Sequence, residues 1–457
     1  ADTATLKSSA KVWLVKSATQ KTLYKTMTGG DQLILGPYLN NVDFEIISSG
    51  SVDISLVGVD YSDPVSMFND KVFGKNNPVN TISPSYARRR LSTIGTTQGT
   101  GISYMAQWPS SVKFDAVQLV YANYDTATYD ITIAKAASAP THQNNGTGLT
   151  WSTVTFNDNG VTVPAGSGSG SDIVPGLLYS DVIPLTAVDR TDGGLSYLLQ
   201  TRTYSSGAQN VTSLSGTEYG LINALNGGAE QWGARSTSGD HVTSIDSQTP
   251  NATGNVLQPQ GIIFYANGVA CRNILWGGDS LTRGYGSTAH ANGMLEQAVV
   301  LAGTDPVRVP YNYGVNGQKH TASIATLRKV LAGFRPDIIG MQIHSINDTT
   351  AAGMDKSVME TLSFLQYVKT LGIPVILSTA AVSGTIVSAN TNAARLAMNN
   401  KCRAMCAAGY ARLLDVATII DDPSNNAQIN PAFNFGDDIH FNDAGYAAIA
   451  NALAPMI

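Results

Sequence analysis

The spacing of apolar residues changes near residue 270, and this change limits the folds that the chain can adopt. Before it, apolar and polar residues alternate in short runs, a pattern typical of strands with one buried face. After it, apolar runs of strand length alternate with segments of helix length. The 457 residues are enough for two or three domains. The sequence therefore predicts a β-rich N-terminal part that is followed by an α/β domain.

The N-terminal part is predicted to comprise a β-rich segment, residues 1–98, and a β-sandwich of the jelly-roll type, residues 99–268. Residues 42–56 alternate twice around the turn sequence SSGS, which predicts a hairpin. Loops rich in Gly, Asn, Ser and Pro separate the later runs. Further strands are predicted at residues 111–123, 128–136, 177–185, 194–205 and 260–266.

The C-terminal part, residues 269–457, is predicted to be an α/β domain. Strands are expected at residues 273–278, 307–314, 336–344, 373–382 and 411–417. Helices are expected at residues 288–302, 320–333, 355–371, 390–408 and 442–454. Strands that alternate with helices through short connections form parallel sheets with helices on both faces. Ligands of such sheets bind at the carboxyl ends of the strands.

Few residues are charged: Asp, Glu, Lys and Arg make up 13 % of the chain, and the formal net charge is −5. This balance gives no electrostatic footprint for nucleic acid or anionic lipid, and no apolar run reaches the roughly 20 residues of a membrane span. Abundant Gly, Tyr, Ser, Thr and Asn are typical of secreted or particle-borne β-rich proteins. We therefore expect a soluble, extracellular or virion-associated protein that binds neither nucleic acid nor membranes.

The stretch NILWGGDSLTRGYG, residues 273–286, places Ser280 just after the first strand of the α/β domain. Gly277 and Gly278 are expected to give the backbone freedom that a sharp strand-to-helix turn needs, with Ser280 exposed on that turn. The stretch is not the G-x-S-x-G motif, because Thr282 occupies the position of the second glycine. A serine nucleophile also needs a base, a group that orients the base, and oxyanion donors. Without them, Ser280 would be an ordinary turn residue.

The base is sought among the six histidines, which are His142, His241, His290, His320, His344 and His440. His440 lies in FGDDIHFNDAGY before the last predicted helix, and Asp437 lies three residues upstream. This offset on a turning loop lets a carboxylate reach the far imidazole nitrogen while the near nitrogen faces the site. Asp438 is the rival orienting residue, and the spacing favours Asp437. In the alternative interpretation, both acids simply precede a helix N-terminus, where negative charge is favourable.

Two further polar clusters follow predicted strands of the same sheet. NYGVNGQ, residues 312–318, follows the second strand, and its glycines could present a backbone N–H to a developing oxyanion. IHSINDT, residues 343–349, follows the third strand, and Asn347 could donate a side-chain N–H. Each cluster alone is better explained as a turn than as a site. Their joint placement at one edge of a parallel sheet indicates an active site.

Residues 269–457 resemble the SGNH (GDSL) hydrolases, a family named for Ser, Gly, Asn and His in four sequence blocks. GGDSLT matches the first block and implies Ser280 as the nucleophile, with its own N–H in the oxyanion hole. NYGVNG and SIND match the second and third blocks, and they imply Gly317 and Asn347 as the backbone and side-chain donors. DDIH matches the Asp-x-x-His block and implies Asp437 and His440 as the partners of the serine. The resemblance implies a three-layer α/β/α, flavodoxin-like fold.

Two residues depart from the family pattern. Ser345 replaces the glycine of the Gly-x-Asn-Asp block, and Phe441 follows the histidine at a position where proline is common. The departures bear on the shape of the site more than on its catalytic groups.

The resemblance implies a serine ester hydrolase that works through an acyl-serine intermediate. The family includes lipases, thioesterases and carbohydrate O-acetylesterases, so the fold does not select the substrate. The accessory β-rich part and the weakly charged composition favour the removal of acetyl groups from a polysaccharide, as in a secreted or phage tail-like protein. Two alternatives remain: a lipase or thioesterase type of carboxylesterase, and a glycan-binding structural protein with a vestigial hydrolase domain.

No metal, nucleotide or other cofactor is predicted, because the sequence contains no H-E-x-x-H, EF-hand or phosphate-binding motif. His344 could contact substrate, but a packed histidine at a strand end is the favoured interpretation. Several aromatic residues of the N-terminal part could form a platform for sugar stacking, although core packing explains them equally well. These residues are Trp108, Tyr121, Tyr124, Trp151 and Trp232.

Overall fold

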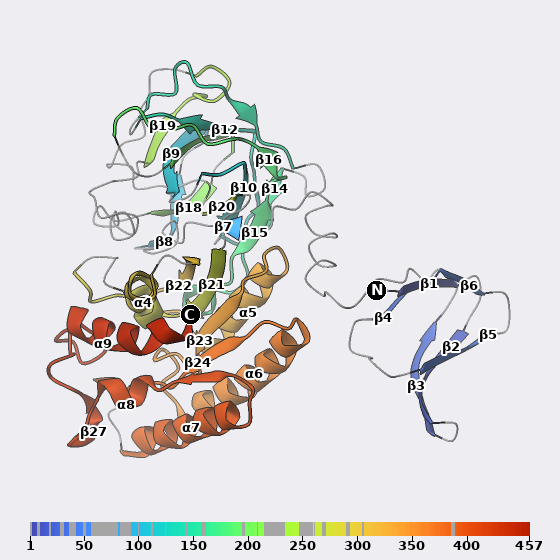
Figure 1. The fold of residues 1–457 in the computed structure, drawn as a ribbon, viewed down its shortest axis with the longest axis vertical. Coiled ribbons are helices and arrows are strands. Elements are labelled where there is room, and N and C mark those ends of the chain that lie inside the picture. Colours follow the sequence, from blue (N-terminus) through green and yellow to red (C-terminus); the bar gives the residue numbers. More distant parts are fainter. Residues whose placement is uncertain are drawn as a thin grey trace. The chain divides into compact units, whose positions relative to one another are not determined.

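The computed structural model divides into two compact units, one within residues 1–77 and one within residues 78–457 (Figure 1). Up to residue 98 it describes only the backbone of the strands. The structure then describes residues 100–457 apart from short gaps, which are 111–112, 124, 142–143, 157–160, 194–196, 208, 214–233, 246–258, 260, 267–270, 289–292, 304–305 and 385–388.

The first unit contains two antiparallel sheets of three strands each. One sheet has the order β4 (Gln32–Leu35), β1 (Asp2–Leu6), β6 (Val52–Ser55). The other has the order β3 (Gln20–Met27), β2 (Ala10–Ser17), β5 (Asp43–Ser48). The predicted hairpin at residues 42–56 is wrong: both strands form, but β5 pairs with β2 and β6 pairs with β1. An alternating pattern predicts a strand and does not specify its neighbour.

The second unit begins with two five-stranded antiparallel sheets. The first contains β15 (Gly176–Tyr179), β10 (Ala116–Asn123), β20 (Gly261–Tyr265), β7 (Thr81–Ile82), and β16 (Ile183–Pro184) beside β10. The second has the order β13 (Ser152–Thr153), β12 (Ile133–Ala139), β17 (Tyr197–Ser205), β9 (Ile102–Ser110), β19 (Ala234–Ser238). Two short pairs accompany them, β11 (Tyr129–Asp130) with β14 (Thr162–Val163) and β8 (Thr93–Gln98) with β18 (Gln209–Ser213). This region is therefore β-rich, as predicted.

The two sheets face each other across a buried core. The Tyr121 hydroxyl on β10 lies 2.9 Å from the Thr203 hydroxyl on β17, and both residues are buried. Trp108 is also fully buried, and its indole N–H donates to Thr201 Oγ1 at 2.9 Å. Trp108 and Tyr121 are therefore core residues and cannot stack on a sugar. Trp151 is partly buried beside a guanidinium group, while Tyr124 and Trp232 lie outside the described residues.

A five-stranded parallel sheet follows, as the sequence predicts. Its order is β22 (Val307–Gly314), β21 (Cys271–Gly278), β23 (Ile338–Gln342), β24 (Val375–Ser378), β25 (Arg412–Leu414). The first strand in sequence lies between the second and the third, which is the flavodoxin-like order. After β22 the chain crosses to the other side of β21 and forms β23 there. The carboxyl ends of β21, β22 and β23 therefore meet at the place where ligands of such folds bind.

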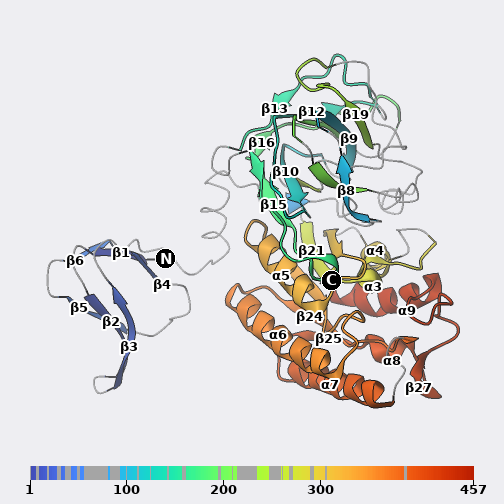
Figure 2. The same ribbon diagram turned by 180° about the vertical axis from the view of Figure 1, so that it is seen from behind.

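Helices cover both faces of the parallel sheet (Figures 1 and 2). On one face, α4 (Met294–Leu301) and α9 (Asp443–Leu453) share an apolar core with side chains of the sheet. On the other face, α6 (Ala351–Thr370) lies between α5 (His320–Leu331) and α7 (Ala389–Ala407), with hydrogen bonds on both sides. The predicted three-layer fold is confirmed. None of the helices in the described parts is long and apolar enough to cross a membrane.

Short elements complete the domain. The α3 helix (Ser280–Arg283) follows β21, and α8 (Val416–Ile420) follows β25. The hairpin of β26 (Asp421–Asp422) and β27 (Asn425–Ile429) comes before the loop that leads to α9. The predicted strand at 411–417 was too long, because its last residues begin α8.

The centre of the sheet is closely packed around Trp276, whose side chain is fully buried. Gly340 on β23 is the neighbour of Trp276 in the parallel register. A Cβ at Gly340 would overlap the Trp276 indole ring. Since the ring is enclosed by core side chains, it has little room to move.

We expect Gly340→Ala to lower the free energy of unfolding by about 1–3 kcal/mol or more, because an added methyl group overpacks the core. Gly207→Ala is the matched control, since a Cβ there meets nothing within 4 Å. Urea titration of both variants checks this expectation. Equal midpoints for the two variants would contradict the packing around Trp276.

Candidate active site

Ser280 is the first residue of α3 and lies directly beyond the carboxyl end of β21. The side chain of Asp279 caps this short helix by accepting the Leu281 N–H at 3.0 Å. Gly284 ends the helix with φ of 84°, in the left-handed region that favours glycine. The prediction of an exposed serine was wrong: Ser280 is only 5 % exposed, because the loops that follow the neighbouring strands enclose it.

Gly277 and Gly278 have a different role from the predicted one. Both lie inside β21, and neither has a positive φ. A Cβ at Gly277 would lie 2.7 Å from Leu327 on α5, and a Cβ at Gly278 would overlap the side chain of Thr282. The two glycines therefore allow close approach of α5 and α3 to the strand, and the bend itself does not depend on them.

His440 links Ser280 to a carboxylate. The Nε2 atom of His440 lies 2.9 Å from Ser280 Oγ, and Nδ1 lies 2.6 Å from Asp437 Oδ2. The second oxygen of Asp437 accepts the backbone N–H groups of Ile439 at 2.9 Å and His440 at 2.8 Å. Burial raises the pKa of Asp437, but these hydrogen bonds outweigh it and hold the pKa below its usual value. Asp437 is therefore ionised and oriented toward the imidazole.

Asp438 turns away from the histidine. Its backbone has φ of 59°, and its carboxylate accepts a hydrogen bond from the Asn434 amide at 2.6 Å. Its backbone carbonyl accepts the Gly384 N–H. Of the two candidate orienting residues, the structure places only Asp437 in contact with the imidazole.

The other described histidines lie away from the serine. Burial and the nearby His344 lower the pKa of His320 to about 3, and its ring contacts the Thr361 hydroxyl. His344 is buried, its Nδ1 atom lies 2.9 Å from the Ser357 hydroxyl, and burial lowers its pKa. These contacts fit a packed histidine, the favoured prediction for His344. His241 lies in the sandwich, and His142 and His290 lie outside the described residues.

The loops after β22 and β23 meet beside Ser280. Gly317 has φ of 70°, which favours glycine at this position of the first loop. The backbone oxygen of the next residue, Gln318, accepts a hydrogen bond from the Asn347 amide at 3.2 Å and lies 2.7 Å from Ser345 Oγ. The structure thus brings the predicted donor loops together.

The side chain of Asn347 also contacts the Ser345 hydroxyl, at 3.0 Å. Both acceptors of the amide lie on one side of its nitrogen, because Ser345 Oγ and Gln318 O are 2.7 Å apart. One N–H can therefore serve both acceptors, and the second N–H is left for a ligand.

Asp279 is a site residue that the sequence analysis missed. Its carboxylate is fully buried, and it accepts hydrogen bonds from the Ser345 hydroxyl at 2.8 Å and the Ile346 N–H at 3.2 Å. Burial raises the pKa of Asp279, and the hydrogen bonds from Ser345, Leu281 and Ile346 oppose this shift. Asp279 therefore ties the serine turn to the loop that carries Asn347. The signal that the sequence offered for this role was an acidic residue directly before the serine.

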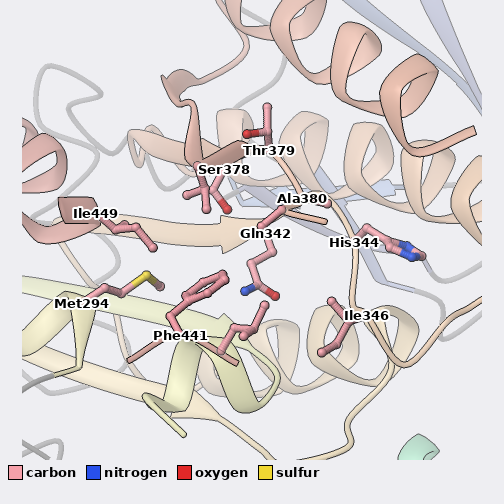
Figure 3. Close-up of a pocket in the computed structure, with 12 residues that line it drawn as sticks. Met294, Gln342, His344, Ile346, Ser378, Thr379, Ala380, Phe441 and Ile449 are labelled. Carbon is pink, nitrogen blue, oxygen red and sulfur yellow. The ribbon is translucent and has the colours of Figure 1, made fainter. Parts of the chain in front are cut away.

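A small cavity lies in the core behind these loops (Figure 3). Leu281, Ile346 and Phe441 line it, and each follows or precedes one of the predicted site residues. Gln342 reaches into the middle of the close-up, while the His344 ring is directed away from it (Figure 3). Ser280, Asn347 and His440 are not among the 12 lining residues. The cavity is therefore a feature of the core that supports the site.

No metal centre is evident in the part of the chain that the structure describes: it contains no group of three or more His, Cys, Asp and Glu residues arranged to hold an ion.

The sequence of this domain matches a known family. Residues 278–448 match the model of the GDSL-like lipase/acylhydrolase family, and this range includes all five predicted site residues. The match identifies this part of the chain as an acylhydrolase domain of that family, and the protein is an esterase. Comparison of the chain with curated proteins gives no match.

Solved structures with similarity to this chain include several acylhydrolases. A putative acylhydrolase from Bacteroides fragilis is 18 % identical over 40 % of this chain and 86 % of its own, with a TM-score of 0.33. A Geobacillus acetyl-xylooligosaccharide esterase is 16 % identical over 40 % and 93 %, with a TM-score of 0.34. A lipase/acylhydrolase from Enterococcus faecalis is 18 % identical over 41 % and 95 %, with a TM-score of 0.33.

The two neighbouring acids provide a direct test of the geometry. We expect Asp437→Asn to lower kcat by about 10³- to 10⁴-fold, because an amide favours the wrong imidazole tautomer and cannot stabilise the imidazolium ion. Asp438→Asn is the matched control and should lower kcat only a few-fold. Steady-state kinetics on a short-chain aryl ester measures both. A larger loss in the Asp438 variant would contradict the observed orientation.

Proposed function

We propose that this esterase removes short acyl groups, chiefly O-acetyl groups, from a carbohydrate through an acyl-Ser280 intermediate. The observation that carries the catalytic part of the proposal is the aligned series of Ser280 Oγ, the two nitrogens of His440, and Asp437, with contacts of 2.9 and 2.6 Å. This is the arrangement that a serine nucleophile, its base and the orienting acid require.

In the first step, Ser280 Oγ attacks the acyl carbonyl carbon while His440 Nε2 accepts the hydroxyl proton. Asp437 accepts the Nδ1 proton of the ring, which fixes the tautomer and stabilises the imidazolium ion. The carbonyl oxygen becomes an oxyanion, and we assign its donors as the backbone N–H groups of Ser280 and Gly317 and the free amide N–H of Asn347.

In the second step, His440 returns the proton to the leaving alcohol as the bond between carbon and oxygen breaks. Water then attacks the acyl-serine, and His440 accepts a proton from that water. The acid is released when the second tetrahedral intermediate returns the serine oxygen as a hydroxyl. No other group has to supply or accept a proton.

The substrate class is supported by composition and by the accessory region. A weakly charged chain rich in Gly, Tyr, Ser, Thr and Asn, with a β-rich accessory part, suits work on a neutral glycan outside the cell or on a virion. Two alternatives remain: a lipase or thioesterase type of carboxylesterase, and a glycan-binding structural protein with an inactive hydrolase domain. The first alternative would differ from the proposed enzyme in the length of the acyl chain that it removes. The second would show no turnover.

We expect the protein to release acetate from at least one acetylated polysaccharide in a panel of xylan and bacterial surface glycans. Enzymatic determination of acetate, with Ser280→Ala as the inactive control, measures this. The variant should lose turnover by several orders of magnitude. Hydrolysis of long-chain esters without acetate release would favour the lipase alternative. Equal rates for the variant and the wild type would contradict the role of Ser280.

A further inference from the structure

We propose that Tyr285 and Phe435 form a binding subsite for the sugar ring that carries the ester. This inference rests on the proposed function and adds the place where the alcohol part of the substrate binds. The two rings are among the exposed large apolar side chains of the described residues, with 39 % and 50 % exposure.

The Tyr285 ring lies directly beside the imidazole. The centroid of the Tyr285 ring is 4.3 Å from that of His440, with an angle of 47° between the planes. Phe435 meets Tyr285 edge to face, with centroids 6.3 Å apart and planes at 77°. The pair therefore extends the surface of His440 outward with apolar ring faces.

The backbone holds both rings in place. The Tyr446 hydroxyl donates to the Tyr285 carbonyl at 2.7 Å, and the Phe435 N–H donates to the His440 carbonyl at 3.0 Å. Gly286, with φ of 92°, lets the two segments approach: a Cβ there would lie 3.2 Å from both His440 Cβ and Phe435 Cγ. The backbone positions of the aromatic pair are thus fixed relative to His440.

The chemistry of the reaction places the leaving alcohol next to this pair. His440 Nε2 has to give its proton to the alcohol oxygen, so that oxygen must come within hydrogen-bonding distance of the imidazole. The acyl oxygen points instead toward the loops of Gly317 and Asn347. Groups attached to the alcohol oxygen therefore extend over the His440 side of the site, where the two rings lie.

The surroundings of the pair suit a sugar better than a long hydrocarbon chain. Asn434, Asp437 and Asp438 border Phe435 in the sequence, and the two acids are exposed. Three residues after Tyr285, Thr288 donates to the carboxylate of Asp443 from both its backbone N–H and its hydroxyl. Two ring faces with a polar border match a pyranose, which has apolar C–H faces and a rim of hydroxyl groups.

The test compares two acetate esters that differ only in the alcohol. We expect Phe435→Ala to lower kcat/KM for an acetylated xylo-oligosaccharide about 10-fold more than for ethyl acetate, a change that corresponds to loss of one stacking contact. Phe435→Tyr keeps a ring and should restore most of the difference. Tyr410→Ala, which removes an exposed aromatic residue that packs on Lys369, is the matched control.

Three results would overturn the subsite. Equal losses on both esters would mean that Phe435 acts through His440, and no loss on either would mean that it binds nothing. If the wild type releases acetate from ethyl acetate but from no acetylated saccharide, the proposed substrate class fails as well. In the second case acetate is still released from the saccharide, so the subsite is overturned and the proposed function stands.

A separate observation leads to a second inference: we infer that the β-sandwich positions the loop of Gly317. The side chain of Gln318 is buried, with 1 % exposure, and its Nε2 atom donates to the Ile173 carbonyl of the sandwich region at 3.0 Å. The same amide contacts the Thr326 hydroxyl on α5 at 3.3 Å. Next to it, Lys329 donates to the Pro175 carbonyl at 2.9 Å.

Gln318 connects this contact to the donors of the site. Its side chain is hydrogen-bonded to the sandwich region, and its backbone oxygen lies next to Ser345 Oγ and accepts a hydrogen bond from the Asn347 amide. Gln318 also directly follows Gly317 in the chain, so the two residues share one loop. Movement of this residue would therefore displace both oxyanion donors together, which makes Gln318 a positioning residue.

We expect Gln318→Leu, which fills the same space without the amide, to lower kcat by about 10-fold or more with little change in KM. Binding of a tetrahedral boronate inhibitor should weaken by the same factor, because that ligand uses the oxyanion donors. Lys401→Ala is the matched control, since its ion pair with Asp355 at 2.8 Å is exposed and joins two helices away from the sandwich. An effect on KM alone, or unchanged boronate binding, would overturn the inference.

Discussion

The hydrogen bond between Ser280 and His440 joins residues that lie 160 positions apart in the sequence, and the fold of the C-terminal domain brings these two residues together. The strand β21 lies between β22 and β23, so the serine that follows it lies at the middle of the carboxyl edge formed by these three strands. The loop before α9 returns the histidine to the same edge. Apolar packing of α9 against α4 and the sheet fixes the position at which that loop ends.

The sequence predicted most of this domain, because strands and helices alternate with clear apolar patterns. The helix at 320–331 and the strand at 307–314 lie where the pattern placed them, and the Asp437 offset predicted the carboxylate that contacts His440. Other features depend on packing across the fold. The role of Gly277, the burial of Ser280 and the pairing of β5 and β6 follow from neighbours distant in the sequence.

Buried polar groups organise the donor side of the site. Asp279 and Ser345 connect the serine turn with the loops of Gly317 and Asn347, and the contacts of Ser345 with Asp279 and Gln318 are buried. Buried hydrogen bonds of this kind are costly to break, so the loops keep one arrangement. Ser345, one of the two residues that depart from the family pattern, supplies a hydroxyl that a glycine would lack. The contact of Gln318 with Ile173 extends the same network into the β-sandwich.

The central claim is that His440 activates Ser280 as a nucleophile. Mass spectrometry after treatment with a fluorophosphonate tests it most directly, because this reagent forms a stable bond with an activated serine. The account predicts one adduct per chain, located on Ser280, and a strongly reduced rate of labelling in His440→Ala. An adduct on another residue, or equally fast labelling of Ser280 without the imidazole, would contradict the account.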